Sequence, residues 1–71
     1  MDKTVEMDQE KLSGIMVFYG TRVPVRNLFD YLRNGESVKE FLEDFPSVSY
    51  EQVREILQEA EFHLERKHDA A

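Results

Sequence analysis

Cysteine is absent from this chain of 71 residues, and glycine and proline are scarce, with three and two copies. Without cysteine there is no disulfide framework and no thiolate chemistry, so a reducing cytoplasm is the expected location. The scattered glycines cannot form a phosphate-binding loop. No apolar run approaches the length of a membrane span, and the acidic start is unlike a secretory signal. We therefore expect a cytoplasmic protein that does not enter a membrane.

Acidic side chains outnumber basic ones, 15 to 9, which gives a formal net charge of −6. Such a chain repels a phosphate backbone unless its cations gather on one face. Arg22, Arg26 and Arg33 lie close together, whereas the last third of the chain is mostly acidic. These charges are expected to be mainly solvated surface, and the three arginines are candidates for contacting DNA.

Residues that could perform catalysis are few. His63 and His68 are five positions apart, so they do not share a helical face as a pair of metal ligands would. Glu59 and His63 do share a face, but two ligands on an exposed helix are a weak metal site. Turns and helix caps account for the serines at positions 13, 37, 47 and 49. We expect no enzyme activity, no metal and no cofactor.

The chain divides into a short arm, one small domain and a tail. Residues 1–13 have no sustained apolar period, which predicts a flexible N-terminal arm. Residues 14–68 form a single small helical domain, and residues 69–71 are expected to be a disordered tail. Within the domain, apolar and aromatic residues from Ile15 onward predict an edge-strand hairpin over residues 15–23. Pro24 then suits the first turn of a helix.

The first predicted helix covers residues 25–34. Its apolar residues recur at helical spacing, and Gly35 is free to adopt the left-handed conformation that ends a helix. The stripe consists of Val25, Leu28, Phe29 and Leu32.

Two further helices have clear start signals. Ser37 with Glu40, and Ser49 with Gln52, each have the spacing of a capping box. Pro46 stops the second helix. The third helix holds an apolar face of Val53, Ile56, Leu57, Ala60 and Leu64, and Val48 is placed to pack on Val53. The predicted core consists of the first helix's stripe with Phe41, Leu42, Val53, Ile56, Leu57 and Ala60.

Short loops between three helices are typical of a helix-turn-helix arrangement, although any three-helix bundle shares this feature. The segment from Gly20 to Val25 (Gly-Thr-Arg-Val-Pro-Val), followed by Gly35-Glu36-Ser37 and Asp44-Phe45-Pro46, resembles the bacterial family called domain of unknown function 433. The resemblance covers about residues 14–60. It implies a mainly α, homeodomain-like three-helix bundle with a short N-terminal β-hairpin.

The same resemblance implies a function, because members of that family are viewed as antitoxin-like partners of toxin proteins. It predicts a toxin partner and, through a helix-turn-helix-like domain, operator DNA. The acidic third helix and residues 1–13 are the candidate contacts for a basic partner. Arg54 and Gln58 join the arginines above as DNA candidates, since they could read base edges, although Glu51 and Glu55 beside them oppose phosphate. The alternative is a protein-interaction or dimerisation module without nucleic-acid binding.

A homodimer is the expected assembly, because a core this small is thin and an edge strand leaves backbone groups unpaired. The candidate contacts are Ile15, Val17 and Tyr19 in the extended segment. Phe62 is a further candidate, since it lies about 180° from Val53 on the helix and therefore faces away from the core.

Overall fold

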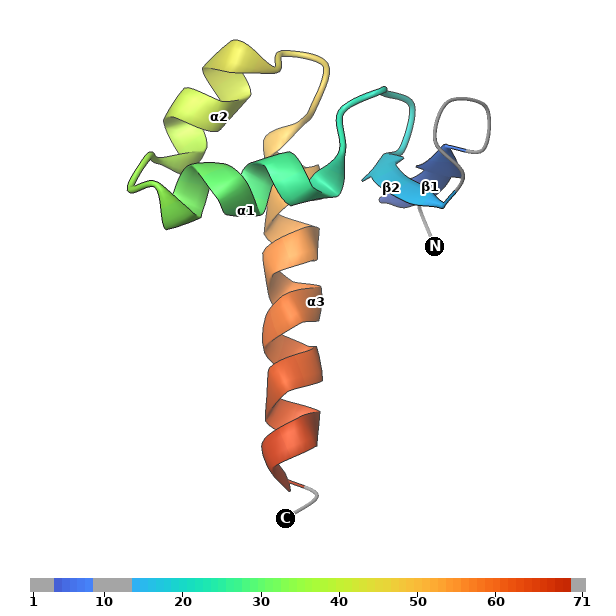
Figure 1. Cartoon of the computed structure of the whole chain (residues 1–71), viewed down its shortest axis with the longest axis vertical. Helices are drawn as coiled ribbons and strands as arrows, with labels where there is room; N and C mark the ends of the chain where they lie inside the picture. Colours follow the sequence, from blue (N-terminus) through green and yellow to red (C-terminus); the bar gives the residue numbers. More distant parts are fainter. Residues whose placement is uncertain (1–3, 9–13, 70–71) are drawn as a thin grey trace.

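The computed structural model describes residues 4–8 and 14–69, which form a β-hairpin and three α-helices (Figure 1). The elements are β1 (Val5–Asp8), β2 (Ile15–Phe18), α1 (Val25–Arg33), α2 (Val38–Asp44) and α3 (Tyr50–Asp69). The predicted mainly α fold with a short N-terminal hairpin is confirmed. Residues 1–3, 9–13 and 70–71 of the predicted arm and tail lie outside the described residues.

The hairpin uses different residues from those predicted. β1 and β2 pair antiparallel, with Val5 opposite Phe18 and Asp8 opposite Ile15. Strand β1 therefore lies inside the segment that composition assigns to the arm. The local pattern misses it because its pairing is non-local, and because Val5 is held by packing against the core of the domain.

Residues 18–24 make a tight return along the other side of β2. The N–H of Phe18 donates to the carbonyl oxygen of Val23 at 3.0 Å, and Val17 forms an isolated antiparallel bridge with Pro24. β1 pairs with β2 on one side and this return covers part of the other. β2 is therefore not the free edge strand that the sequence pattern predicts.

The start and the end of α1 follow from two special residues. Pro24, with φ −64° and ψ 139°, is extended and directly precedes the helix. Gly35 adopts φ +84°, a conformation that side chains with a Cβ rarely adopt. The N–H groups of Gly35 and Glu36 then donate to the carbonyl oxygens of Leu32 and Tyr31 at 3.1 and 2.9 Å. This pair of bonds is a Schellman motif, so the predicted helix end is confirmed.

Both predicted capping boxes are present. Ser37 Oγ accepts from the Glu40 N–H at 3.1 Å, and Glu40 Oε1 accepts from the Ser37 N–H at 2.8 Å. Ser49 and Gln52 exchange the equivalent bonds at 3.1 and 3.0 Å. Each box satisfies two N–H groups that a helix start otherwise leaves without partners.

The core lies where β2 and the three helices meet. Its buried members are Phe18, Val25, Leu28, Phe41, Val48 and Val53. The predicted residues Phe29, Leu32, Leu42, Ile56 and Leu57 pack around them and are half-buried. Phe18 and Val48 are additions that the predicted core does not contain.

Helix α3 is much longer than the elements it packs against. It has 20 residues, whereas α1 and α2 have 9 and 7. Its far end extends away from the other helices and the hairpin (Figure 1). We call residues 60–69 the outer half of α3. Leu64 continues the buried stripe of the helix but is 59% exposed, because the short helices end before they reach it.

Candidate protein-binding surface

Most residues of the segment from Gly20 to Val25 shape or stabilise the turn that leads from β2 to α1. Gly20 has φ +78°, and the Thr21 hydroxyl donates to the Phe18 carbonyl oxygen at 2.8 Å. The same hydroxyl accepts from the Val23 N–H at 3.0 Å, which shapes the return toward α1. Arg22 is the exception, because its side chain is exposed and makes no hydrogen bond or ion pair with the described residues.

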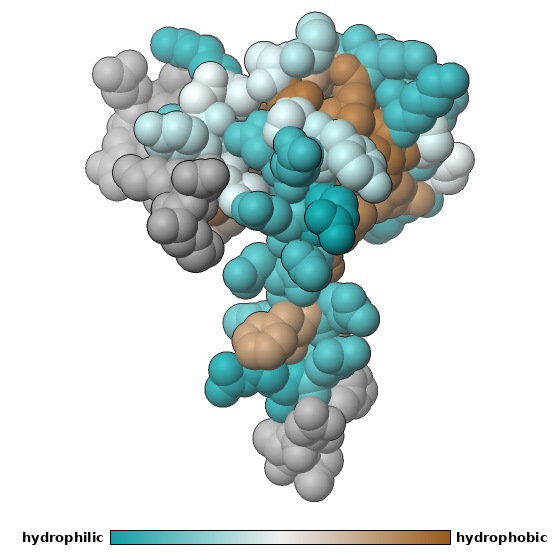
Figure 2. Space-filling view, turned by 180° about the vertical axis from the view of Figure 1, so that it is seen from behind, coloured by the Kyte–Doolittle hydropathy of each residue, from teal (hydrophilic) through white to brown (hydrophobic). Residues whose placement is uncertain are grey.

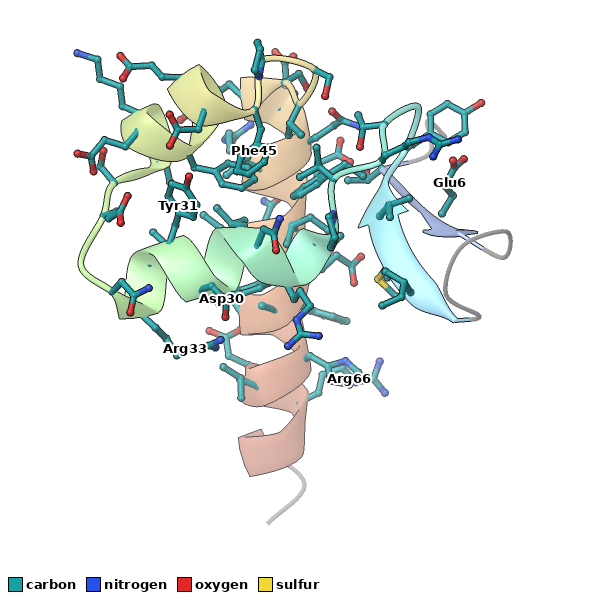
Figure 3. All side chains as sticks on the ribbon, turned by 45° about the horizontal axis from the view of Figure 1, so that its top comes forward. Glu6, Asp30, Tyr31, Arg33, Phe45 and Arg66 are labelled. Atoms are coloured by element: carbon teal, nitrogen blue, oxygen red, sulfur yellow. The ribbon has the colours of Figure 1, made fainter. Side chains whose placement is uncertain are left out.

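The predicted DNA-contacting arginines differ in their surroundings. Arg26 is exposed on α1 and, like Arg22, has no ion-pair partner within the described part of the chain. Arg33 is instead paired with Asp30 one turn earlier on the same helix (Figure 3). The structure therefore leaves two cations near the start of α1 available and partly neutralises the third.

The charges at the start of helix α3 are unfavourable for insertion into a DNA groove. Arg54 and Gln58 are exposed as predicted, but Glu51 and Glu55 are exposed as well. The Glu55 carboxylate accepts a hydrogen bond from the Thr4 hydroxyl, which fixes it close to the hairpin. Two carboxylates beside Arg54 oppose the approach of a phosphate backbone.

An acidic face with one aromatic residue runs along the solvent side of α3. Glu51, Glu55, Glu59 and Phe62 lie within about 80° of one another around the helix axis. All four are exposed, and Phe62 is 55% exposed on the outer half. Figure 2 shows this side of the helix as mostly hydrophilic. We call these four residues the acidic face.

The Phe62 ring is also held by a cation. The Arg66 guanidinium lies over the ring, 5.5 Å from its centroid. Such a cation–π contact limits the movement of both side chains. Arg66 extends from the outer part of α3 (Figure 3).

The hairpin is attached to α3 by the side-chain amide of Gln52 as well as by the hydrogen bond between Thr4 and Glu55. Gln52 Nε2 donates to the Tyr19 carbonyl oxygen at 3.0 Å and contacts the Thr4 carbonyl oxygen at 3.5 Å. Its Oε1 is already engaged in the capping box with Ser49. Gln52 therefore couples the helix start to both strands of the hairpin, a role that the sequence pattern does not reveal.

The dimer contacts predicted in the extended segment are only partly accessible. Ile15 is half-buried, and Tyr19 is 46% exposed. Val17 is only 2% exposed, so its side chain offers little surface to a second copy. The return through Pro24 also occupies part of the side of β2 that the pattern leaves open for a second copy.

Two open hollows lie on the body of the domain. One, of about 450 Å³, lies between α2 and the start of α3. Its lining consists of Val38, Lys39, Leu42, Glu43 and Tyr50. We call it the α2–α3 groove, and an apolar surface is visible on this side of the molecule (Figure 2). The other, of about 370 Å³, lies between the start of β2 and α1 and is lined by Gly14, Ile15, Met16, Val25, Arg26 and Phe29.

One titratable group has a strongly shifted pKa. The Tyr31 hydroxyl donates to Asp44 Oδ2 at 2.6 Å, and this hydrogen bond is the main reason that the pKa of Tyr31 is raised to about 12. A phenol with that pKa stays protonated near neutral pH and does not serve as a general base there. Among the described residues, no group of three or more His, Cys, Asp or Glu side chains is arranged to hold a metal ion.

Comparison with known proteins places most of the chain, but not Phe62 or Arg66, within one family. The sequence model described as "Protein of unknown function (DUF433)" matches residues 5–60, which include β1, β2, α1, α2 and the first half of α3. Neither the curated proteins nor the solved structures give a match. Within the described part of the chain, no helix is both long enough and apolar enough to cross a membrane.

Proposed function

This chain belongs to the DUF433 family, and on that premise we propose that it is the antitoxin-like component of a toxin–antitoxin pair. In this role it is not an enzyme and acts in the cytoplasm by binding a toxin protein. The contact is the acidic face of α3, and the toxin surface that it fits is basic with an apolar pocket.

The exposed Phe62 on the acidic face is the observation that carries this proposal. Aromatic side chains supply much of the binding energy of protein interfaces, typically from the centre of a ring of weaker contacts. Here the aromatic ring lies 55% exposed on a stretch of helix that no other described element covers. Glu55 and Glu59 beside it would attract a basic surface and speed its approach.

The test is co-expression of the chain with the product of the adjacent gene, followed by measurement of affinity. We expect Phe62→Ala, and separately Glu55→Lys with Glu59→Lys, to weaken binding at least tenfold, which corresponds to about 1.4 kcal/mol. Glu36→Lys is the matched control, because it reverses an exposed charge between α1 and α2. Equal binding by all four proteins would contradict the proposed contact.

Contact with operator DNA is the second function, and Arg22 and Arg26 favour it. Both are exposed near the start of α1, and neither has an ion-pair partner within the described residues. Two copies of the chain would present two sets of these cations to one DNA site, while the net charge of each copy stays at −6. A chain that binds its partner but no DNA would instead be an interaction module alone.

We also expect the protein to act as a homodimer. The contact predicted through the extended segment is weakened, because Val17 is buried and β2 has neighbours on both sides. Phe62 lies on the acidic face assigned here to the toxin. The homodimer therefore needs a different contact surface, one that is complementary to the same surface of a second copy.

A further inference from the structure

A second stripe runs along α3 on a different side from the acidic face. Tyr50, Leu57 and Leu64 are spaced by seven residues, so they drift by only about 20° per step around the axis. Tyr50 is 60% and Leu64 59% exposed, and Leu57 is half-buried at the margin of the core. Large apolar side chains at this spacing are typical of helices that pair with another helix.

Two charges of opposite sign lie between these apolar residues. Arg54 falls between Tyr50 and Leu57, and Glu61 falls between Leu57 and Leu64, with both side chains exposed. The order along this side of the helix is therefore apolar, positive, apolar, negative, apolar. We call these five residues the α3 seam.

When the order of the seam residues is read backwards from Leu64 to Tyr50, the apolar positions stay the same and the positive and negative positions exchange. In an antiparallel pair with Leu57 at the twofold axis, Tyr50 lies opposite Leu64 of the second copy. Arg54 then lies within one residue of Glu61 of the second copy, which is a step of about 1.5 Å along the helix. In a parallel pair the same seam would set arginine against arginine and glutamate against glutamate, which is unfavourable.

The body of the domain leaves room for this partner helix. The α2–α3 groove lies beside Tyr50, and Val38 and Leu42 give it an apolar wall. An antiparallel second α3 would bring its Leu64 beside Tyr50, which forms part of the lining of this groove. Its Leu64 would there be removed from water, which favours association by the burial of apolar surface.

We propose that two copies of the chain pair through their α3 seams, antiparallel, with each Leu64 seated at the α2–α3 groove of the other. This rests on the homodimer proposed above and specifies its surface. The acidic face lies more than about 80° from the seam residues Tyr50, Leu57 and Leu64 around the helix, so the dimer leaves it accessible to a toxin.

Sedimentation at micromolar concentration tests the pairing with variants at exposed positions. We expect a dimer for the native chain and for Phe62→Ser, and a monomer for Leu64→Glu. Arg54→Glu should raise the dimer dissociation constant at least tenfold, and adding Glu61→Arg to it should restore the dimer. If Leu64→Glu still formed a dimer, or if Phe62→Ser abolished the dimer, the seam would not be the contact surface, although the homodimer itself would stand. A monomeric native chain overturns both the seam and the homodimer.

The lack of cysteine allows a direct check of the geometry. Leu57→Cys places two thiols across the proposed twofold axis, and a disulfide forms only when the two Cα atoms are about 4.4–6.8 Å apart. Mild oxidation should therefore crosslink Leu57→Cys into a covalent dimer and leave Glu59→Cys, on the acidic face, uncrosslinked. Crosslinking of Glu59→Cys in preference to Leu57→Cys would place the contact on the wrong side of α3.

Discussion

Tyr31 shows how much one side chain contributes to joining the short helices. Its ring meets the rings of Phe41 and Phe45 edge-on, with centroids 5.3 and 5.8 Å apart. These edge-to-face contacts are favourable beyond simple burial. The hydroxyl at the other end of the side chain donates to Asp44, so α1 is tied to α2 by packing and by a hydrogen bond (Figure 3).

Replacing Asp44 by Asn should lower the pKa of Tyr31 from about 12 toward its ordinary value of 10.0, because the charged acceptor for its proton is gone. In the native chain the folded protein holds this proton more tightly than the unfolded chain. The stability from this bond is therefore fully present below pH 10 and is lost as the pH rises toward 12.

The phenolate absorbance of the native chain and of Asp44→Asn, titrated side by side, measures this shift. Tyr31→Phe identifies which of the titrating tyrosines is responsible. Glu43→Gln is the control, since it removes a neighbouring charge on α2 but not the acceptor. A titration curve unchanged by Asp44→Asn would show that the hydrogen bond does not form in solution.

At the scale of elements, the helix boundaries were predictable and the strand pairing was not. Ser37 with Glu40 and Ser49 with Gln52 are recognisable because each box closes within four residues, and Gly35 acts within the turn that it ends. The pairing of Val5 with Phe18 depends on packing between distant segments, which no local pattern contains. Tertiary contacts of this kind commonly override local propensity.

Some features of the candidate sites were also predictable from the sequence, whereas others depend on tertiary structure. The exposure of Phe62 follows from helical periodicity, because the residue lies opposite Val53. The exposure of Leu64 does not, since the sequence places it on the buried stripe and only the shortness of α1 and α2 leaves it uncovered. The bridge between Val17 and Pro24 likewise could not be predicted from the strand pattern.

Gln52 offers a test of how the hairpin is attached to α3. Gln52→Glu keeps an oxygen for the capping box with Ser49 but removes the N–H donor to the Tyr19 carbonyl oxygen. We expect it to lower the free energy of unfolding by about 0.5–1.5 kcal/mol, the usual net value of such a bond. Urea denaturation measures the loss, and amide hydrogen exchange should show faster opening of the hairpin than of α1.

The other capping box provides the matched control for this change. Glu40→Gln exchanges the same two residue types in reverse, and its amide oxygen can still accept from the Ser37 N–H. Its stability should change little. If Gln52→Glu were as stable as Glu40→Gln, the bond from Gln52 to the hairpin would contribute nothing.

On the scale of the whole molecule, charge controls what the protein can approach. The net charge of −6 repels nucleic acid, and the exposed glutamates of α3 contribute much of it. Arg22 and Arg26 lie near the start of α1, at a distance along the chain from those glutamates. We therefore expect DNA to be approached with Arg22 and Arg26 toward the phosphates.

We expect the chain to bind its own promoter DNA weakly and with steep salt dependence. Arg22→Ala with Arg26→Ala should abolish most of this affinity and reduce the slope of log affinity against log salt by about 0.9 for each phosphate that the protein no longer neutralises. Arg33→Ala should change it less, because Asp30 already pairs with that guanidinium. Titration of promoter DNA with each protein, at low and at moderate salt, measures the loss of affinity in the Arg22/Arg26 double variant and in Arg33→Ala.

Binding that is unaffected by the replacement of Arg22 and Arg26 would exclude the α1 side as the DNA surface. If Arg54→Ala and Gln58→Ala governed tight binding instead, α3 would read the groove directly. If neither the native chain nor any variant bound DNA, the protein would be a protein-interaction module without a nucleic-acid role.

The length of α3 beyond its packed half also bears on how long the protein survives in a cell. The outer half spans residues 60–69, and isolated helices shorter than about 12–15 residues are marginal in water without support from packing. Such a segment opens locally far more often than the core, and open segments are where proteases cut. A toxin or a second copy that covers it keeps it helical and out of a protease's reach. The lifetime of the chain would then depend on the supply of its partners, so an unpartnered copy would be the first to be degraded.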